Sequence, residues 1–194
     1  MHKQTSIEAS RVGLWDKRYA GQYTRKMYDD PLTAKKAAEF IKKIGIKTIE
    51  DWGCGYGGFR NYIGDFQEYI GIDGSQSRYT DKIVDLEKYT SNIDAIHIRH
   101  VLEHNIHWVK ILENAIQSFQ NCMVLTIFTP FVQETTIVAE YPNFENTGIT
   151  MVDIAFKRED IVKYFANLQW TSEENIKTET QYGIEHMFFL QKIS

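Results

Sequence analysis

Residues 49–58 have the sequence IEDWGCGYGG, which combines the end of a short apolar strand, an acid and a loop with four glycines in six positions. Glycine has no Cβ and accepts positive φ, so such a loop lets a ligand lie directly against the backbone. Gly53, Gly55 and Gly58 satisfy the G-x-G-x-x-G pattern of dinucleotide-binding loops. Asp51 precedes the first glycine by two residues, however, and its carboxylate would repel a bound pyrophosphate. The segment therefore favours a ligand that carries a positive charge.

S-adenosylmethionine (SAM) is such a ligand, because it has an ammonium group and a sulfonium but no phosphate. Residues 49–58 resemble motif I of the class I SAM-dependent methyltransferases, and three further segments follow in the order of that family. These are YIGIDGS at residues 69–75, KIVDL at residues 82–86 and IDAIHIRHVLEH at residues 93–104. The resemblance implies a Rossmann-like fold and methyl transfer with SAM as cofactor. A dinucleotide oxidoreductase is the weaker alternative.

The resemblance also implies a cofactor site at the ends of several strands. Asp73, at the tip of the second strand, would accept hydrogen bonds from both ribose hydroxyls. Asp85 and Leu86 would border the adenine, and the backbone at Arg99 and His100 would border the methionine part. The cofactor-binding residues predicted in this part of the chain are Asp51, Gly53, Cys54, Gly55, Tyr56, Asp73, Gly74, Ser75, Asp85, Leu86, Arg99 and His100.

Residues 15–19, WDKRY, resemble the N-terminal element of several small-molecule methyltransferases, in which an arm folds over the cofactor. Residues 1–30 are predicted to form this arm. Arg18 offers a guanidinium that can pair bidentately with the cofactor's carboxylate, and Tyr19 offers a hydroxyl, so both are predicted to bind the cofactor. For Trp15, a plain aromatic anchor of the arm is an equal alternative.

The predicted fold class is α/β. Residues 31–44 have apolar side chains at helical spacing, and strand and helix patterns alternate from Lys47 onward, which indicates right-handed βαβ units and a parallel sheet. The resemblance implies a doubly wound, mostly parallel, Rossmann-like sheet with an antiparallel closing strand, to which residues 168–176 and 184–193 are assigned as a pair. At 194 residues the chain fits a single domain, residues 1–194.

Residues 130–156 are predicted to form a hairpin insertion after the fifth strand. Two strand-like segments, residues 135–140 and 149–156, flank a turn with the sequence PNFENTG. The insertion follows the strand beside which the cofactor's methyl group is expected to emerge, so we interpret it as a lid over the methyl acceptor. A structural flap or a contact in a homodimer is the alternative.

Two histidines are the candidate catalytic residues. His100 is the first candidate for a general base and His104 the second, because an imidazole titrates near neutral pH. These histidines can also merely shape the pocket, since methyl transfer is often driven by positioning the nucleophile. Residues 100–104 further spell H-x-x-E-H, a zinc pattern that requires a continuous helix and a third ligand. Within the methyltransferase order we predict no metal site.

Composition narrows the classes of partner. The chain carries a formal charge of −4 without a basic stripe, so nucleic acid is not expected as a partner. Cys54 and Cys122 are interpreted as buried thiols, the sequence holds no apolar run of membrane-spanning length, and its polar start is no signal peptide. A cytoplasmic protein is expected.

The function predicted is methyl transfer from SAM to a small-molecule acceptor, with an oxygen nucleophile mildly favoured because of the histidines. A sugar or another metabolite is a more plausible acceptor than nucleic acid. No Asn/Asp-Pro-Pro-Tyr segment, which would hold the target nitrogen of an exocyclic amine, follows the fourth strand. The alternative from another class is a non-catalytic SAM-binding regulatory or accessory subunit. An intact cofactor signature does not separate the two, since binding alone requires it.

Overall fold

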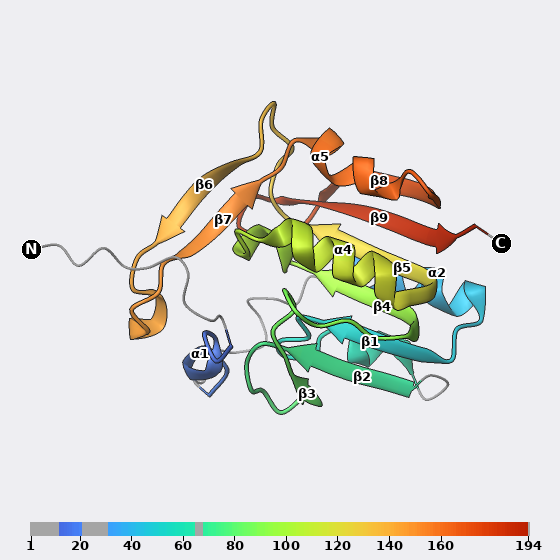
Figure 1. The fold of residues 1–194 in the computed structure, drawn as a ribbon, viewed down its shortest axis with the longest axis horizontal. Helices are drawn as coiled ribbons and strands as arrows, with labels where there is room; N and C mark the ends of the chain where they lie inside the picture. The colour runs from blue at the N-terminus through green and yellow to red at the C-terminus, as the bar shows by residue number, and fades with distance from the viewer. Residues whose placement is uncertain (1–11, 21–30, 65–67, 194) are drawn as a thin grey trace, which may run out of the picture.

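A computed structural model describes residues 12–20, 31–64 and 68–193, and its centre is a seven-stranded sheet (Figure 1). The strand order is β3-β2-β1-β4-β5-β9-β8. Strands β1 to β5 pair in parallel, and β9 runs antiparallel to both of its neighbours. This arrangement confirms the predicted fold class. The strands are β1 (Thr48–Trp52), β2 (Glu68–Asp73), β3 (Lys82–Ile83), β4 (Ile93–Arg99), β5 (Phe119–Ile127), β8 (Leu168–Lys177) and β9 (Ile184–Lys192).

Helices cover both faces of the sheet, as expected for a doubly wound fold. On one face lie α2 (Pro31–Ile44) and α3 (Arg60–Ile63), whose Ala37, Ile41 and Ile63 join a buried apolar cluster with strand residues. On the other face lie α4 (Trp108–Ser118) and α5 (Arg158–Val162), which contribute to the larger cluster. Asp30, which precedes Pro31 and is a candidate N-cap by its residue type, lies outside the described residues. No helix in the described part of the chain is long and apolar enough to cross a membrane.

Alternation along β4 decides which side chains reach each face. Ile96 and Ile98 belong to the cluster under α4, whereas Ala95 belongs to the cluster under α2. Because successive side chains of a strand point to opposite faces, His97 and Arg99 lie on the α2 face with Ala95. On the α2 face of β4, the polar residues His97 and Arg99 therefore lie beside Ala95, which belongs to an apolar cluster.

Several elements are shorter than the sequence pattern predicts. The third strand comprises only Lys82–Ile83, and the last helix is divided into α5 and the 3₁₀ helix η4 (Lys163–Phe165). After β4 the chain forms the 3₁₀ helix η2 (Leu102–His104), and α4 begins only at Trp108. A helix therefore does not start directly after β4 at Val101. The reason is local, because His100 has a φ of 59°, a left-handed conformation that a right-handed helix does not accommodate.

The hairpin insertion is present as a separate two-stranded sheet. Its strands β6 (Thr136–Tyr141) and β7 (Met151–Ala155) pair antiparallel, and the turn between them contains the 3₁₀ helix η3 (Phe144–Asn146). Figure 1 shows this hairpin and the arm helix α1 (Asp16–Ala20) on the same side of the molecule, where the parallel strands end.

The described part of the arm, residues 12–20, contacts both the loop that follows β2 and the hairpin. Gly13 N–H donates to Gly74 O (2.6 Å), and Trp15 N–H donates to Ser75 Oγ (2.8 Å). The Trp15 ring packs against Phe144 of the hairpin at a centroid distance of 4.7 Å. The space above the strand ends is therefore bounded by the arm and the hairpin together.

Candidate functional site

A cavity of about 640 Å³ lies at the carboxyl ends of β1, β2 and β4. This is the switch point of the sheet, where β1 has β2 on one side and β4 on the other, and open α/β sheets bind ligands at that place. The cavity continues beneath the hairpin, where Tyr141, Met151 and Asp153 line it. Every predicted site residue except Ser75 lines the cavity, namely Arg18, Tyr19, Asp51, Gly53, Cys54, Gly55, Tyr56, Asp73, Gly74, Asp85, Leu86, Arg99, His100 and His104.

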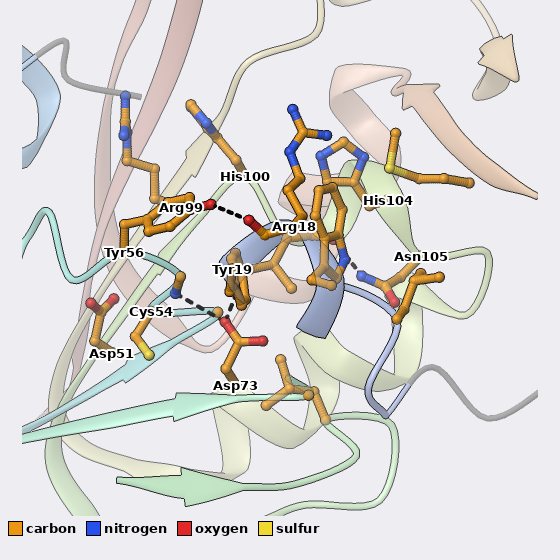
Figure 2. A pocket seen from close by; sticks show the side chains of 18 of the residues that line it. Arg18, Tyr19, Asp51, Cys54, Tyr56, Asp73, Arg99, His100, His104 and Asn105 are labelled. Atoms are coloured by element: carbon orange, nitrogen blue, oxygen red, sulfur yellow. Dashed lines mark hydrogen bonds between the residues drawn. The ribbon is translucent and has the colours of Figure 1, made fainter. Parts of the chain in front are cut away.

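Asp73 is held with its carboxylate at the cavity wall. Gly55 N–H and Ser75 N–H each donate to it at 2.9 Å, and Tyr19 OH lies 3.5 Å from Oδ2. Figure 2 shows this side chain at the bottom of the cavity, below Tyr19. Burial raises the pKa of Asp73 to about 6, although the backbone hydrogen bonds oppose this shift. Ser75 is fully buried and acts through its backbone and its bond to the arm.

Gly53 shows why the loop requires glycine. Its φ is 77°, and a Cβ built on it would lie 2.2 Å from Cγ2 of Val101. Its N–H donates to Ile72 O at 2.7 Å, which ties the start of the loop to the end of β2. The loop backbone therefore lies against the wall of the cavity. Cys54 is a buried free thiol, as predicted, and burial raises its pKa.

Asp51 forms a buried polar chain beside the loop. Its Oδ1 lies 2.7 Å from His97 Nδ1, and its Oδ2 accepts a hydrogen bond from Tyr69 OH at 2.6 Å. His97 is buried and stacks on Phe59 with ring centroids 3.8 Å apart, so it is a packed residue. Within the described residues, His97 Nε2 is buried without a hydrogen-bond partner. Sequence reasoning singled out the acid but not the residues that hold it.

A second polar cluster joins the end of β4 to β9. Arg99 and His100 both contact the carboxylate of Glu185, which is fully buried and also accepts a hydrogen bond from Thr33 Oγ1 at 2.9 Å. Sequence reasoning missed Glu185 and Thr33. The available signal was an acid at the start of the apolar run IEHMFFLQKI, residues 184–193, because a charged side chain in a buried strand requires partners.

His104 faces the hairpin rather than His100. Its Nδ1 lies 3.1 Å from Val152 O and 3.1 Å from Asp153 Oδ1. Asp153 also accepts hydrogen bonds from Tyr141 OH and Tyr182 OH, both at 3.0 Å. Burial acts to raise the pKa of Asp153, but the hydrogen bonds from His104 and the two tyrosines outweigh it and hold the pKa below its usual value. These contacts fix β7 against the body of the protein.

The H-x-x-E-H segment lacks the continuous helix that the zinc pattern requires, because His100 is left-handed and only residues 102–104 are helical. Its two histidines bond to different strands, β9 and β7. Glu103 is fully buried, and its Oε1 accepts a hydrogen bond from Phe128 N–H at 2.6 Å. Burial raises its pKa to about 7.

The arm residues pack against one another and against the hairpin. The Arg18 guanidinium lies 5.3 Å from the ring centroid of Trp15 and 5.5 Å from that of Phe144. Tyr56 OH donates to Arg18 O at 2.7 Å, and the Tyr19 and Tyr56 rings are 5.0 Å apart. Figure 2 shows Tyr19 next to Asp73 and Arg18 next to His104. The arm therefore spans both ends of the cavity.

Comparisons with known proteins place the fold. No model of a protein family matches the sequence, and no curated protein matches it. Among solved structures, the chain resembles 1,6-didemethyltoxoflavin-N1-methyltransferase of Burkholderia thailandensis, which has 1,6-didemethyltoxoflavin and S-adenosylhomocysteine bound. The TM-score is 0.65 at 12% identity over 93% of this chain and 88% of that one. It also resembles magnesium protoporphyrin IX methyltransferase of Synechocystis with bound SAM, with a TM-score of 0.64 at 13% identity over 93% and 90% of the chains.

A third solved structure, the complex of DhpI with S-adenosylhomocysteine, has a TM-score of 0.61 at 14% identity and covers 93% of both chains. The likeness extends over nearly the whole of each protein. The chain therefore has the fold of the class I methyltransferases.

Proposed function

We propose that this protein transfers the methyl group of SAM to a small-molecule acceptor. The observation that carries the proposal is the position of Asp73, whose carboxylate lines the cavity beside a glycine loop at the switch point of a methyltransferase fold. All three of the structures compared above bind SAM or its demethylated product, S-adenosylhomocysteine.

The chemistry of the lining fits this cofactor better than a dinucleotide. Asp51, Asp73, Asp85 and Glu87 all line the cavity, so its lining is rich in carboxylates. Carboxylates accept hydrogen bonds from ribose hydroxyls and attract an ammonium or a sulfonium, whereas they repel a pyrophosphate. In this assignment Asp73 accepts from the ribose, Asp85 and Leu86 border the adenine, and Arg18 pairs with the carboxylate.

The other end of the cavity receives the methyl acceptor. When bound, SAM supplies a methyl group activated by its sulfonium. His100, His104 and Phe128 line this end together with the hairpin residues, so an acceptor there is surrounded by rings and by two imidazoles. We assign His100 as the group that takes the proton of an acceptor hydroxyl, which favours an oxygen nucleophile such as that of a sugar or another hydroxylated metabolite.

Two measurements test this proposal. Calorimetry should detect binding of S-adenosylhomocysteine and none of NAD(H). Incubation with methyl-labelled SAM and panels of hydroxylated metabolites and amines should then transfer label to a small molecule. Tight binding of S-adenosylhomocysteine without transfer to any acceptor would favour a regulatory or accessory subunit, and binding of NAD(H) alone would contradict the cofactor assignment.

The hairpin gives a prediction for acceptor binding. Phe144→Ala removes the ring that packs on Trp15, so the hairpin loses part of its hold over the acceptor end. We expect the acceptor's KM to rise about 2- to 10-fold, because an aromatic pair contributes about 0.5–1.5 kcal/mol and 1.4 kcal/mol corresponds to tenfold. The Kd of S-adenosylhomocysteine should change less. Ile137→Ala, on the exposed face of β6, is the matched control; equal effects of both variants on KM would contradict a lid role.

A further inference from the structure

Glu185 is a fully buried acid that accepts from three residues, Thr33, Arg99 and His100. Its Oε1 accepts from Arg99 Nε at 3.0 Å and Nη2 at 2.9 Å, and it also contacts His100 Nε2. Its Oε2 accepts from Thr33 Oγ1 of α2 at 2.9 Å. A buried carboxylate with this many donors has a fixed position, because moving it would leave several of them unpaired.

The contact with Glu185 determines which imidazole nitrogen of His100 carries the proton. Burial acts to raise the pKa of Glu185, but the hydrogen bond from His100 and the charge of Arg99 outweigh it and hold the pKa below its usual value. An ionised carboxylate can only accept hydrogen bonds, so Nε2 must be the protonated nitrogen. Nδ1 then carries a lone pair, and nothing in residues 12–20, 31–64 or 68–193 donates to it.

The backbone of His100 is held as firmly as its ring. Its N–H donates to Thr126 O at 3.1 Å, although the residue adopts the left-handed conformation that non-glycine residues rarely occupy. Such strain persists only where the surrounding structure over-determines it, and it gathers at functional sites. The ring of Phe128 lies 4.8 Å away and limits rotation of the imidazole.

We infer that Glu185 is a positioning residue, which holds His100 in the tautomer with hydrogen on Nε2 and thereby presents Nδ1 as the proton acceptor. The step it serves rests on the proposed function. The acceptor oxygen forms a bond to the methyl carbon as the carbon–sulfur bond breaks, and the electron pair of the broken bond stays on sulfur. The hydroxyl proton of the acceptor moves to Nδ1 of His100. The resulting imidazolium is then balanced by the carboxylate of Glu185.

Proton transfer to His100 depends on the negative charge of Glu185, because the other charged neighbour, Arg99, is positive. The groups that face His100 are Arg99 on β4, Glu185 on β9 and His104 on η2, and Phe128 at the end of β5 is apolar. Burial and the positive charge of Arg99 lower the pKa of His100 to about 4, and Glu185 opposes this shift. Loss of the Glu185 charge would therefore make the imidazole a still weaker base.

Imidazole ¹⁵N NMR of the wild-type protein tests the tautomer without any assay of activity. We expect the His100 signals to show hydrogen on Nε2 and a bare Nδ1 from pH 6 to 8. Hydrogen on Nδ1 in the wild type would overturn the inference. The NMR measurement does not require an acceptor. If no acceptor is found, the proposed function fails, but the tautomer of His100 still shows whether Glu185 accepts its Nε2 proton.

A double-mutant cycle tests the role in catalysis. In Glu185→Gln, the amide lacks the negative charge that balances the imidazolium, while the oxygen at the Oε1 position can still receive Arg99 and His100. We expect kcat to fall about tenfold or more, as part of the roughly 10²–10⁴-fold that a general base contributes, while the KM for SAM changes little. In a His100→Gln background, the same substitution should lower kcat less than about twofold, because residues that act as a unit are not additive.

The matched control is Glu173→Gln on the neighbouring strand β8, whose half-exposed carboxylate also bonds to α2, through Lys36 at 2.7 Å. It should keep wild-type kcat. Thr33→Val removes one donor to Glu185 and serves as a milder variant if Glu185→Gln does not fold. Full additivity in the cycle, or normal turnover of His100→Gln, would overturn the inference.

Discussion

Replacing His100 by Gln is expected to lower kcat for methyl transfer about 10²-fold or more, the usual contribution of a general base. Gln fills similar space and can still bond to Glu185, but its side chain cannot take up a proton. The Kd of S-adenosylhomocysteine should stay near the wild-type value, because the imidazole serves the acceptor. Single-turnover rates at saturating SAM measure the effect. His107→Gln, an exposed histidine before α4, is the matched control.

The pH profile of the wild type supplies an independent check on His100. A histidine accepts a proton only in its neutral form, and burial together with Arg99 lowers the pKa of His100 to about 4. At saturating SAM, kcat should therefore stay level as pH falls from 8 to 6, whereas an ordinary imidazole with a pKa near 6.5 would lose activity in that range. A midpoint near pH 6.5 that disappears in His107→Gln or another histidine variant would place the base elsewhere.

Asp73→Asn is expected to weaken binding of S-adenosylhomocysteine by about 1.5–3 kcal/mol, or roughly 10- to 100-fold, the scale of hydrogen bonds to a charged group. The amide keeps the shape of the side chain, but it has lost the charge and one acceptor that two ribose hydroxyls require. Isothermal calorimetry at pH 8 measures the change. Asp160→Asn on α5, a half-exposed acid that does not line the cavity, is the matched control, and normal affinity of Asp73→Asn would contradict the ribose assignment.

The same acid predicts how cofactor affinity depends on pH. Burial raises the pKa of Asp73 to about 6 in the ligand-free protein, and only the ionised carboxylate can accept from both hydroxyls. Affinity should be constant above pH 6 and should fall about tenfold for each pH unit below it, since binding must then displace one proton. In Asp73→Asn this dependence should vanish. A flat wild-type profile from pH 8 to 5 would show that the ionised form is not required.

Local pattern was sufficient for the sheet and for placing Asp73 and the glycine loop at the strand ends that line the cavity. Motif spacing places Asp73 at the tip of β2 and the glycines at the tip of β1, because a residue's place on a strand fixes where it lies at the sheet edge. The hairpin was also predictable, since its two strand-like runs surround a turn signal. Its role as a lid stays a prediction.

The partners of the polar residues were not predictable, because they come from distant parts of the chain. Glu185 reaches His100 only because β9 inserts antiparallel beside β5, and His97 meets Asp51 only because β4 pairs with β1. Neither pairing leaves a spacing signal near the residue concerned. The left-handed His100, which shortens the following helix, likewise depends on Thr126 and Phe128 of the neighbouring strand.

The hairpin forms its own two-stranded sheet and shares no strand pairing with the seven-stranded sheet in the described part of the chain. The residues proposed to hold the cofactor lie at the ends of the parallel strands and on the arm, whereas the hairpin supplies Tyr141, Met151 and Asp153 to the end proposed for the acceptor. If the protein methylates a small molecule as proposed, we expect substitutions in residues 136–155 to alter which molecule is methylated while the source of the methyl group stays the same. In evolution, a new acceptor specificity would then require changes in this one segment only, and the seven-stranded sheet could stay the same.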